Sequence, residues 1–175
     1  MKILFISLGC DKNLADSEEM LGLLTGNGHE IVDSEEEADA IVINTCCFIH
    51  DAKEESVNTI LEMAEYKKTG TCKILIVTGC MAQRYKEEIT EEIPEVDAVL
   101  GTTSYGDIVK ALNEAEAGHV FQEFKDINAL PEDSGRRVIT TGGHFGYLKI
   151  AEGCDKHCTY CIIPSLRGKF RSVPE

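Results

Sequence analysis

Short apolar segments alternate with longer amphipathic segments along most of the chain, and this alternation strongly restricts its fold. We expect strands at the apolar segments 2–8, 29–32, 39–44, 73–78 and 97–100. Helical spacing of apolar residues predicts helices between them, beginning near Asp16, Asp51, Met81 and Ser104. Alternation of this kind favours an α/β fold. We predict an open, mostly parallel sheet with helices on both faces, in flavodoxin-like or Rossmann-like order.

The pattern changes after residue 118, where a segment with several glycines begins. Pro131, Gly135, Gly142 and Gly143 are typical of a linker, so we predict an α/β domain over 1–118 and a linker over 119–144. Residues 147–151 predict another strand. About thirty residues cannot bury a core alone, so we expect residues 145–175 to be the truncated start of a second domain.

The composition is that of an ordinary globular protein with many cysteines. Hydrophobic residues make up 43% of the chain and charged residues 27%. No apolar run approaches the ~20 residues of a membrane span, so we expect a cytoplasmic protein without membrane contact. In a reducing compartment, eight cysteines indicate metal or redox chemistry rather than structural disulfides.

The net charge of −14 is unevenly distributed. Residues 136–175 hold seven basic and three acidic groups, whereas residues 1–135 hold ten basic and 28 acidic groups. The acidic front part predicts a basic partner, although acidity also simply favours solubility. Direct binding of nucleic acid by this part of the chain is disfavoured, because the phosphates would be repelled.

Three cysteines follow predicted strands directly, and we call Cys10, Cys46 and Cys80 the scattered triplet. The carboxyl ends of parallel strands share one edge of a sheet, where ligands bind, so these three thiols can converge. Helix N-termini at that edge favour an anionic thiolate cluster. Three buried cysteines without a ligand are the alternative. Spacing does not choose between Cys46 and Cys47, and Cys72 is expected to be inert at the opposite edge.

Cys154, Cys158 and Cys161 form a second group, the tight triplet, with C-x3-C-x2-C spacing. Three thiolates from one loop can bind three corners of an iron–sulfur cube and leave the fourth iron open. Zinc bound by these cysteines and His157 is an alternative, but His157 directly precedes Cys158 and would strain a tetrahedral site. A C-x2-C redox pair leaves Cys154 unexplained.

The segment CDKHCTYC at 154–161 resembles the cluster motif of radical S-adenosylmethionine enzymes, which has an aromatic residue before the third cysteine. The segments SLGCDKN at 7–13, NTCCFI at 44–49 and TGCMAQRY at 78–85 resemble the N-terminal domain of the methylthiotransferase family. That family usually carries a small residue at the position of Cys47, so the resemblance assigns the ligand to Cys46. The sequence around Lys12 and Asn13, and around Arg167 and Gly168, resembles that of the family members that modify a ribosomal protein.

The resemblance implies two [4Fe–4S] clusters. The tight triplet would hold the cluster whose open iron binds S-adenosylmethionine, with Tyr160 beside the adenine, at the start of a radical S-adenosylmethionine barrel. Cleavage of that cofactor would give a radical that abstracts an unactivated hydrogen. The scattered triplet would hold an auxiliary cluster that carries sulfur to the substrate radical. Implied partners are small-subunit ribosomal protein twelve, methylthiolated at an aspartate β-carbon, and an electron donor such as flavodoxin or ferredoxin.

Three other functions are compatible with the residues. These are a tRNA-adenosine methylthiotransferase, an iron–sulfur electron-transfer module, and a flavodoxin-like binding domain with incidental thiols. Electron transfer would favour four cysteines per cluster, and neither triplet offers an obvious fourth. We expect the chain alone not to turn over, because most of the implied barrel is missing. Detection of a methylthiolated peptide made by the purified chain would contradict this expectation.

Overall fold

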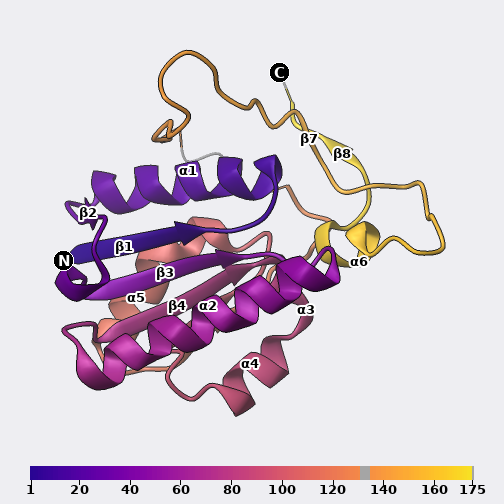
Figure 1. Ribbon diagram of the computed structural model, residues 1–175. Coiled ribbons are helices and arrows are strands. Elements are labelled where there is room, and N and C mark those ends of the chain that lie inside the picture. Colours follow the sequence, from indigo (N-terminus) through magenta and orange to yellow (C-terminus); the bar gives the residue numbers. More distant parts are fainter. Residues whose placement is uncertain (131–134, 175) are drawn as a thin grey trace.

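The computed structural model describes residues 1–130 and 135–174, so residues 131–134 of the expected linker and Glu175 lie outside the described part. One sheet contains six strands (Figure 1): β1 (Lys2–Ser7), β2 (Glu30–Val32), β3 (Ala40–Thr45), β4 (Ile74–Gly79), β5 (Ala98–Leu100) and β6 (Phe121–Glu123). The connecting helices are α1 (Asp11–Gly26), α2 (His50–Thr69), α3 (Cys80–Arg84), α4 (Lys86–Glu92) and α5 (Ile108–Glu116), with short 3-10 turns at Glu35–Glu37 and Tyr105–Asp107.

The strand order is β2-β1-β3-β4-β5-β6, and every neighbouring pair is parallel. The predicted open parallel α/β sheet in flavodoxin-like order is therefore confirmed, with one strand more than expected. The chain leaves β1 toward β2 on one side and returns to β3 on the other. This reversal between β1 and β3 marks the position at which open α/β sheets bind ligands.

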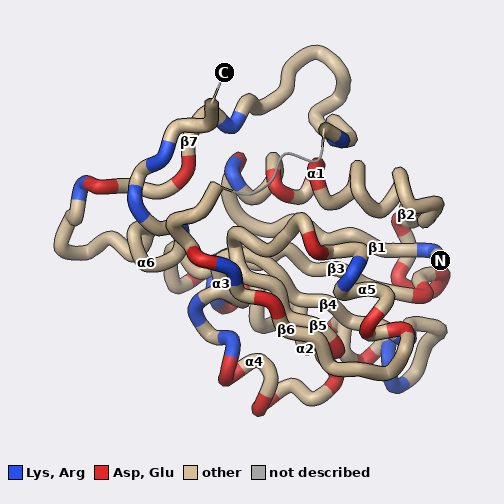
Figure 2. The backbone as a smooth tube through the Cα atoms, turned by 180° about the vertical axis from the view of Figure 1, so that it is seen from behind, with Lys and Arg blue, Asp and Glu red and all other residues tan. Residues whose placement is uncertain are grey.

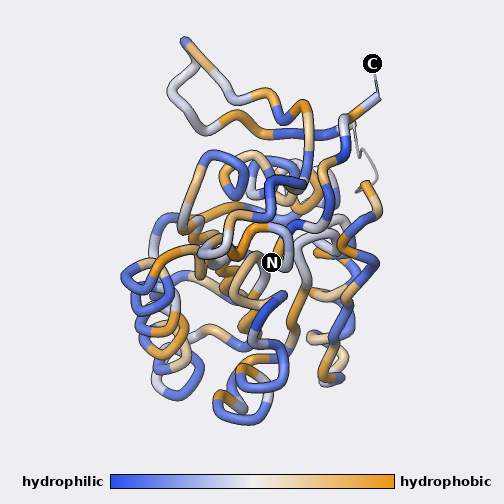
Figure 3. The backbone as a smooth tube through the Cα atoms, turned by 90° about the vertical axis from the view of Figure 1, so that its right-hand side faces the viewer, coloured by the Kyte–Doolittle hydropathy of each residue, from blue (hydrophilic) through white to orange (hydrophobic). Residues whose placement is uncertain are grey.

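Helices cover both faces of the sheet, so its central strands β3 and β4 are buried on both sides. In β3, Ala40 and Val42 belong to the hydrophobic core beneath α1 and α5, while Ile41 and Ile43 belong to the core beneath α2 and α3. Burial on both faces explains why the strand segments are continuously apolar. Figure 3 shows hydrophobic residues through the middle of this part and alternating hydropathy along the outer helices.

Two predicted helices differ from the observed ones. Helix α1 begins at Asp11, so Asp16 lies inside the helix and does not cap it. Asp16 is buried and paired with cations from the end of the chain, a tertiary role that local spacing cannot reveal. The expected single helix after residue 80 is broken at Tyr85, whose φ of −121° is not helical, and this separates α3 from α4.

The remaining elements lie near the chain's end. Strand β6 falls inside the segment expected to be a linker and extends the sheet by pairing with β5. The strand expected at 147–151 is reduced to β7 (Ala151–Glu152), which pairs antiparallel with β8 (Arg171–Ser172). Helix α6 (Ile163–Arg167) lies between them and packs Leu166 into the core beneath α2 and α3. That these residues begin a second domain, a barrel, stays a prediction.

Charges on the backbone trace follow the uneven distribution in the sequence. Figure 2 shows acidic residues spread over the sheet and its helices, and several basic residues along the segment that includes β7 and the C-terminus. Within the described residues, none of the helices combines the length and the apolar character needed to cross a membrane.

Candidate metal centre

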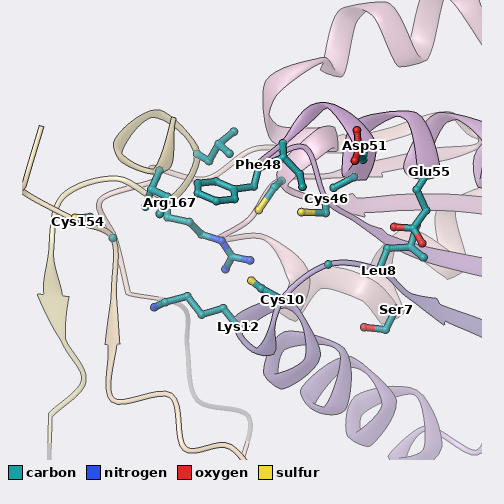
Figure 4. Close-up of a pocket in the computed structure, with 17 residues that line it drawn as sticks. Ser7, Leu8, Cys10, Lys12, Cys46, Phe48, Asp51, Glu55, Cys154 and Arg167 are labelled. Carbon is teal, nitrogen blue, oxygen red and sulfur yellow. The ribbon is translucent and has the colours of Figure 1, made fainter. Parts of the chain in front are cut away.

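The scattered triplet gathers at the carboxyl edge of the sheet. Cys10 precedes α1 directly, Cys46 follows the last residue of β3, and Cys80 begins α3 immediately after β4. All three line one cavity of about 1120 Å³, and Cys154 of the tight triplet lines it as well. Figure 4 shows the Cys10 and Cys46 side chains with Arg167 extending toward them. The strand-end argument thus places the three thiols correctly, while their role as ligands stays a prediction.

The structure separates the two neighbouring cysteines of the second loop. Cys46 faces the cavity, and the Ser56 hydroxyl on α2 holds its backbone by accepting from Cys46 N at 3.0 Å and donating to Cys46 O at 2.8 Å. Cys47 belongs to the hydrophobic core, where its Sγ lies 3.3 Å from Cys80 O. Burial raises the pKa of the Cys47 thiol to about 12, so it stays protonated at neutral pH.

Cys72 is buried just before β4, at the amino edge of the sheet, and its Sγ contacts the Ile74 carbonyl at 3.3 Å. Burial also raises the pKa of its thiol. The predicted place of Cys72 at the opposite edge is confirmed, and its inertness stays a prediction.

Glycines directly before two of the cysteines make room for the edge to close. A Cβ at Gly9 would lie 2.7 Å from Cys46 Cβ, and one at Gly79 would overlap Asn44 Oδ1 and the Thr45 carbonyl. Gly79 has φ 93° and ψ −157°, a conformation that glycine alone adopts readily. The three cysteine loops can therefore approach closely only because these positions lack side chains.

We expect Gly79→Ala to destabilise the protein by about 3 kcal/mol or more, because backbone strain adds to the overlap with β3. Gly28→Ala is the matched control: Gly28 also has positive φ, at 83°, but a Cβ there meets nothing within 4 Å. That variant should cost about 1–2 kcal/mol. Urea unfolding measures both, and equal losses would show that the crowding at Gly79 has no energetic consequence.

The tight triplet lies on the segment after β7. Cys154 N donates to Gly168 O at 3.1 Å, and Cys161 N donates to Cys158 O at 3.0 Å. Cys158 is exposed, and Tyr160 is 90% exposed. The neighbouring His157 has a positive φ of 48°. Across 1–130 and 135–174, no group of three or more His, Cys, Asp or Glu side chains is close enough to bind a metal as it stands.

The donor set nevertheless suits an iron–sulfur cluster better than a hard cation. Thiols are the soft ligands of such clusters, and the cavity presents one from each of three strand ends. Burial raises the pKa of the Cys80 thiol, and the Arg167 guanidinium opposes that shift. A fixed positive charge beside this site favours an anionic thiolate cluster there.

Four charged side chains form a buried ionic cluster beside the cavity: Asp16, Lys149, Glu152 and Arg167. Arg167 Nη1 lies 2.6 Å from Asp16 Oδ2 and 3.2 Å from Glu152 Oε1. Lys149 Nζ contacts Asp16 and lies 3.1 Å from Glu152 Oε1. Each side chain is at most 10% exposed. Three members come from the end of the chain, so the cluster fastens that segment to α1.

Attraction between opposite charges favours the charged forms of Glu152, Lys149 and Arg167. Burial alone would raise the pKa of Glu152, but Arg167 and Lys149 hold it below the ordinary value. For the two cations the directions are reversed: burial alone would lower the pKa of Lys149 and of Arg167, but Asp16 raises both above their ordinary values. Sequence reasoning missed these residues. The available signal was Asp16 itself, four residues before Met20 and eight before Leu24, on the apolar stripe of its helix.

A second buried carboxylate on α1, that of Glu18, binds the segment that contains Arg137 and Thr140. Glu18 accepts from Arg137 Nε at 2.9 Å and from Thr140 N at 2.7 Å. Burial would raise the pKa of Glu18, but the hydrogen bonds from Thr140 and Arg137 outweigh it and lower that pKa below its ordinary 4.5.

We expect Glu18→Gln to cost about 2–3 kcal/mol of unfolding free energy at pH 7, because a charge-assisted bond to Arg137 is lost. A depressed carboxyl pKa contributes stability that is complete above pH 4.5 and disappears as the pH falls through the folded value. The difference between variant and wild type should therefore shrink in acid. Urea unfolding from pH 7 to pH 3 tests this, with exposed Glu62→Gln as control. A difference that stays constant with pH would contradict the prediction.

Taken together, the fold and the site define a doubly wound α/β protein with a candidate iron–sulfur centre at the switch point of its sheet. Residues 2–101 match a family model described as "Uncharacterized protein family UPF0004". The chain belongs to this family.

Three relatives bear the name "Ribosomal protein uS12 methylthiotransferase RimO". The chain is 67% identical to the protein of Lachnoclostridium phytofermentans over 99% of its own length and 40% of the relative's. It is 52% identical to the protein of Clostridioides difficile (98% and 39%) and 51% identical to that of Desulforamulus reducens (97% and 38%). The chain thus spans about two fifths of the length of these relatives.

Proposed function

We propose that the chain is part of an enzyme that methylthiolates the β-carbon of an aspartate in small-subunit ribosomal protein twelve, named uS12 in the relatives. The observation that carries this proposal is the shared cavity of Cys10, Cys46 and Cys80, which Cys154 of the second triplet also lines. Because Cys154 lines the same cavity, a metal centre on the tight triplet would lie near one on the scattered triplet, as a reaction that needs both centres requires. Relatives up to 67% identical that bear the methylthiotransferase name support the same reading.

The residues suit two clusters. Cys10, Cys46 and Cys80 would hold one [4Fe–4S] cluster, and Cys154, Cys158 and Cys161 the other, with S-adenosylmethionine bound beside exposed Tyr160. Bound together, these cofactors supply radical hydrogen abstraction and a transferable methylated sulfur. The protein's own contribution is to hold three thiols of the first site on separate strand ends and to place the fixed charge of Arg167 beside them.

The domain division follows from this assignment. We assign residues 1–118 to the N-terminal methylthiotransferase domain, 119–144 to a linker, and 145–175 to the start of the radical S-adenosylmethionine domain. Strand β6 belongs to the sheet although it lies in the linker segment. The excess of acidic residues before Arg136 suits a basic substrate such as a ribosomal protein. The electron donor would be a flavodoxin or ferredoxin, in the cytoplasm.

The test is mass spectrometry of uS12 from cells that carry either the wild-type enzyme or its Cys10→Ala variant. We expect the methylthio group in wild type and its loss in the variant, because one ligand of the first site is removed. Cys72→Ala is the matched control and should leave the modification intact. A methylthio group that persists with Cys10→Ala, or that is found on tRNA adenosine instead of uS12, would contradict the proposal.

A further inference from the structure

The Asn13 side chain is fully buried in the first turn of α1, three residues after Cys10. Its amide nitrogen donates to two backbone carbonyls, Leu8 O at 3.0 Å and Thr45 O at 2.8 Å. Leu8 lies two residues before Cys10, and Thr45 directly precedes Cys46. One side chain therefore ties the loop after β1 to the loop after β3.

The amide oxygen of Asn13 faces the third cysteine and the end of the chain. Cys80 Sγ donates to Asn13 Oδ1 at 3.7 Å, and Arg167 Nη2 donates to the same oxygen. The assignment of oxygen and nitrogen follows from the partners: the two carbonyls require a donor, and the guanidinium requires an acceptor. Asn13 thus contacts all three loops of the scattered triplet and the segment that carries the tight triplet.

The Arg167 contact is itself held in place. Arg167 ends α6, six residues after Cys161, and its side chain is fixed by Asp16 on the next turn of α1 after Asn13. This arginine therefore links the segment that carries the tight triplet to Asn13. Asparagine is the residue type that meets these demands, because an aspartate of equal size would turn a second oxygen toward two carbonyls.

We propose that Asn13 is the positioning residue of the scattered triplet, and that Arg167, held by Asp16, keeps its guanidinium at Asn13 and beside that triplet. This inference gives a residue-level basis to the proposed function, and in the metal-free protein it is testable independently of that function. It predicts that loss of the Asn13 donors releases the loops of Cys46 and Cys80 while the rest of the core stays packed.

The first experiment is alkylation of the metal-free protein at fixed pH, with each cysteine followed by mass spectrometry. We expect Asn13→Asp to raise the labelling rates of Cys46 and Cys80 about tenfold, because two buried carbonyls lose their donors. Cys72 should stay protected, since it is buried at the opposite, amino edge of the sheet. Asn27→Asp, the same change at the exposed end of α1, is the matched control.

Two outcomes overturn the inference. Unchanged rates at Cys46 and Cys80 would show that Asn13 does not hold their loops. A labelling rate that rises equally at Cys72 would show that the substitution loosens the whole domain, as substitution of any core residue can. If Asn13→Asp does not fold, Asn13→Ser is measured in the same way and is judged by the same two outcomes.

A second experiment tests the Arg167 half in anaerobically reconstituted protein whose tight triplet is replaced by alanine. We expect Arg167→Gln to lower the midpoint potential of the remaining cluster, because a positive charge nearby favours the reduced, more negative state. Arg167→Lys should restore most of the potential. An unchanged potential in Arg167→Gln would overturn this half. If even the wild-type triplet takes up no iron, the proposed function fails, while the alkylation result stands.

Discussion

Replacing Cys46 by alanine should abolish iron binding by the scattered triplet, whereas replacing its neighbour Cys47 should leave that iron in place. Cys46 lines the cavity shared with Cys10 and Cys80, while Cys47 belongs to the core and its thiol stays protonated. The measurement is iron per chain after anaerobic reconstitution, in a background whose tight triplet is replaced by alanine. We expect about four irons for Cys47→Ala and close to none for Cys46→Ala.

The comparison is well matched, because each variant removes one thiol group and the two positions are adjacent and similarly buried. Cys72→Ala serves as a further control and should also keep about four irons. Loss of iron from Cys47→Ala with retention by Cys46→Ala would show that the loop presents the other thiol and would overturn the assignment made from the cavity.

Asp16→Ala should destabilise the protein by about 3–5 kcal/mol, because it leaves two buried cations without their carboxylate. Arg167 and Lys149 both contact Asp16, and Glu152 alone would then face both. The segment that carries the tight triplet should detach from α1 at the same time. Urea unfolding measures the free energy, and limited proteolysis followed by mass spectrometry reports cleavage near residues 149–167.

Asp33→Ala is the control, since Asp33 is an exposed aspartate beyond β2 and its loss should change the free energy by less than about 0.5 kcal/mol. A similarly small effect for Asp16→Ala, with no new cleavage, would mean that the buried ionic cluster does not fasten the two parts together.

Much of the fold was predictable because local and global demands agree in the sheet. Continuous apolar segments such as 39–44 and 73–78 predict strands buried on both faces, and they are. Parallel order then places Cys10, Cys46 and Cys80 at one edge without any knowledge of distances. The sequence alone did not choose between Cys46 and Cys47. Both lie beyond the end of β3, where the alternation of side chains between the two faces of a strand no longer applies, so the choice rests on the cavity lining or on the family resemblance.

What the sequence did not reveal depends on contacts between distant segments. Asp16 has the spacing of a helix cap, yet it is an internal residue paired with Arg167, 151 residues later. The short strand β6 has three residues and relies on pairing with β5, so local propensity gives little indication of it. Asn13 resembles any polar residue of a first helical turn, and its role depends on the carbonyls and the guanidinium that meet there.

Native mass spectrometry of the anaerobically reconstituted protein tests the central claim most directly, because it counts clusters on each folded chain. The intact protein should carry two [4Fe–4S] clusters, about eight irons in all. A variant that retains only Cys10, Cys46 and Cys80 of the two triplets should carry one. A folded variant of this kind that carries no cluster would contradict the claim that three strand ends of this sheet form a metal centre.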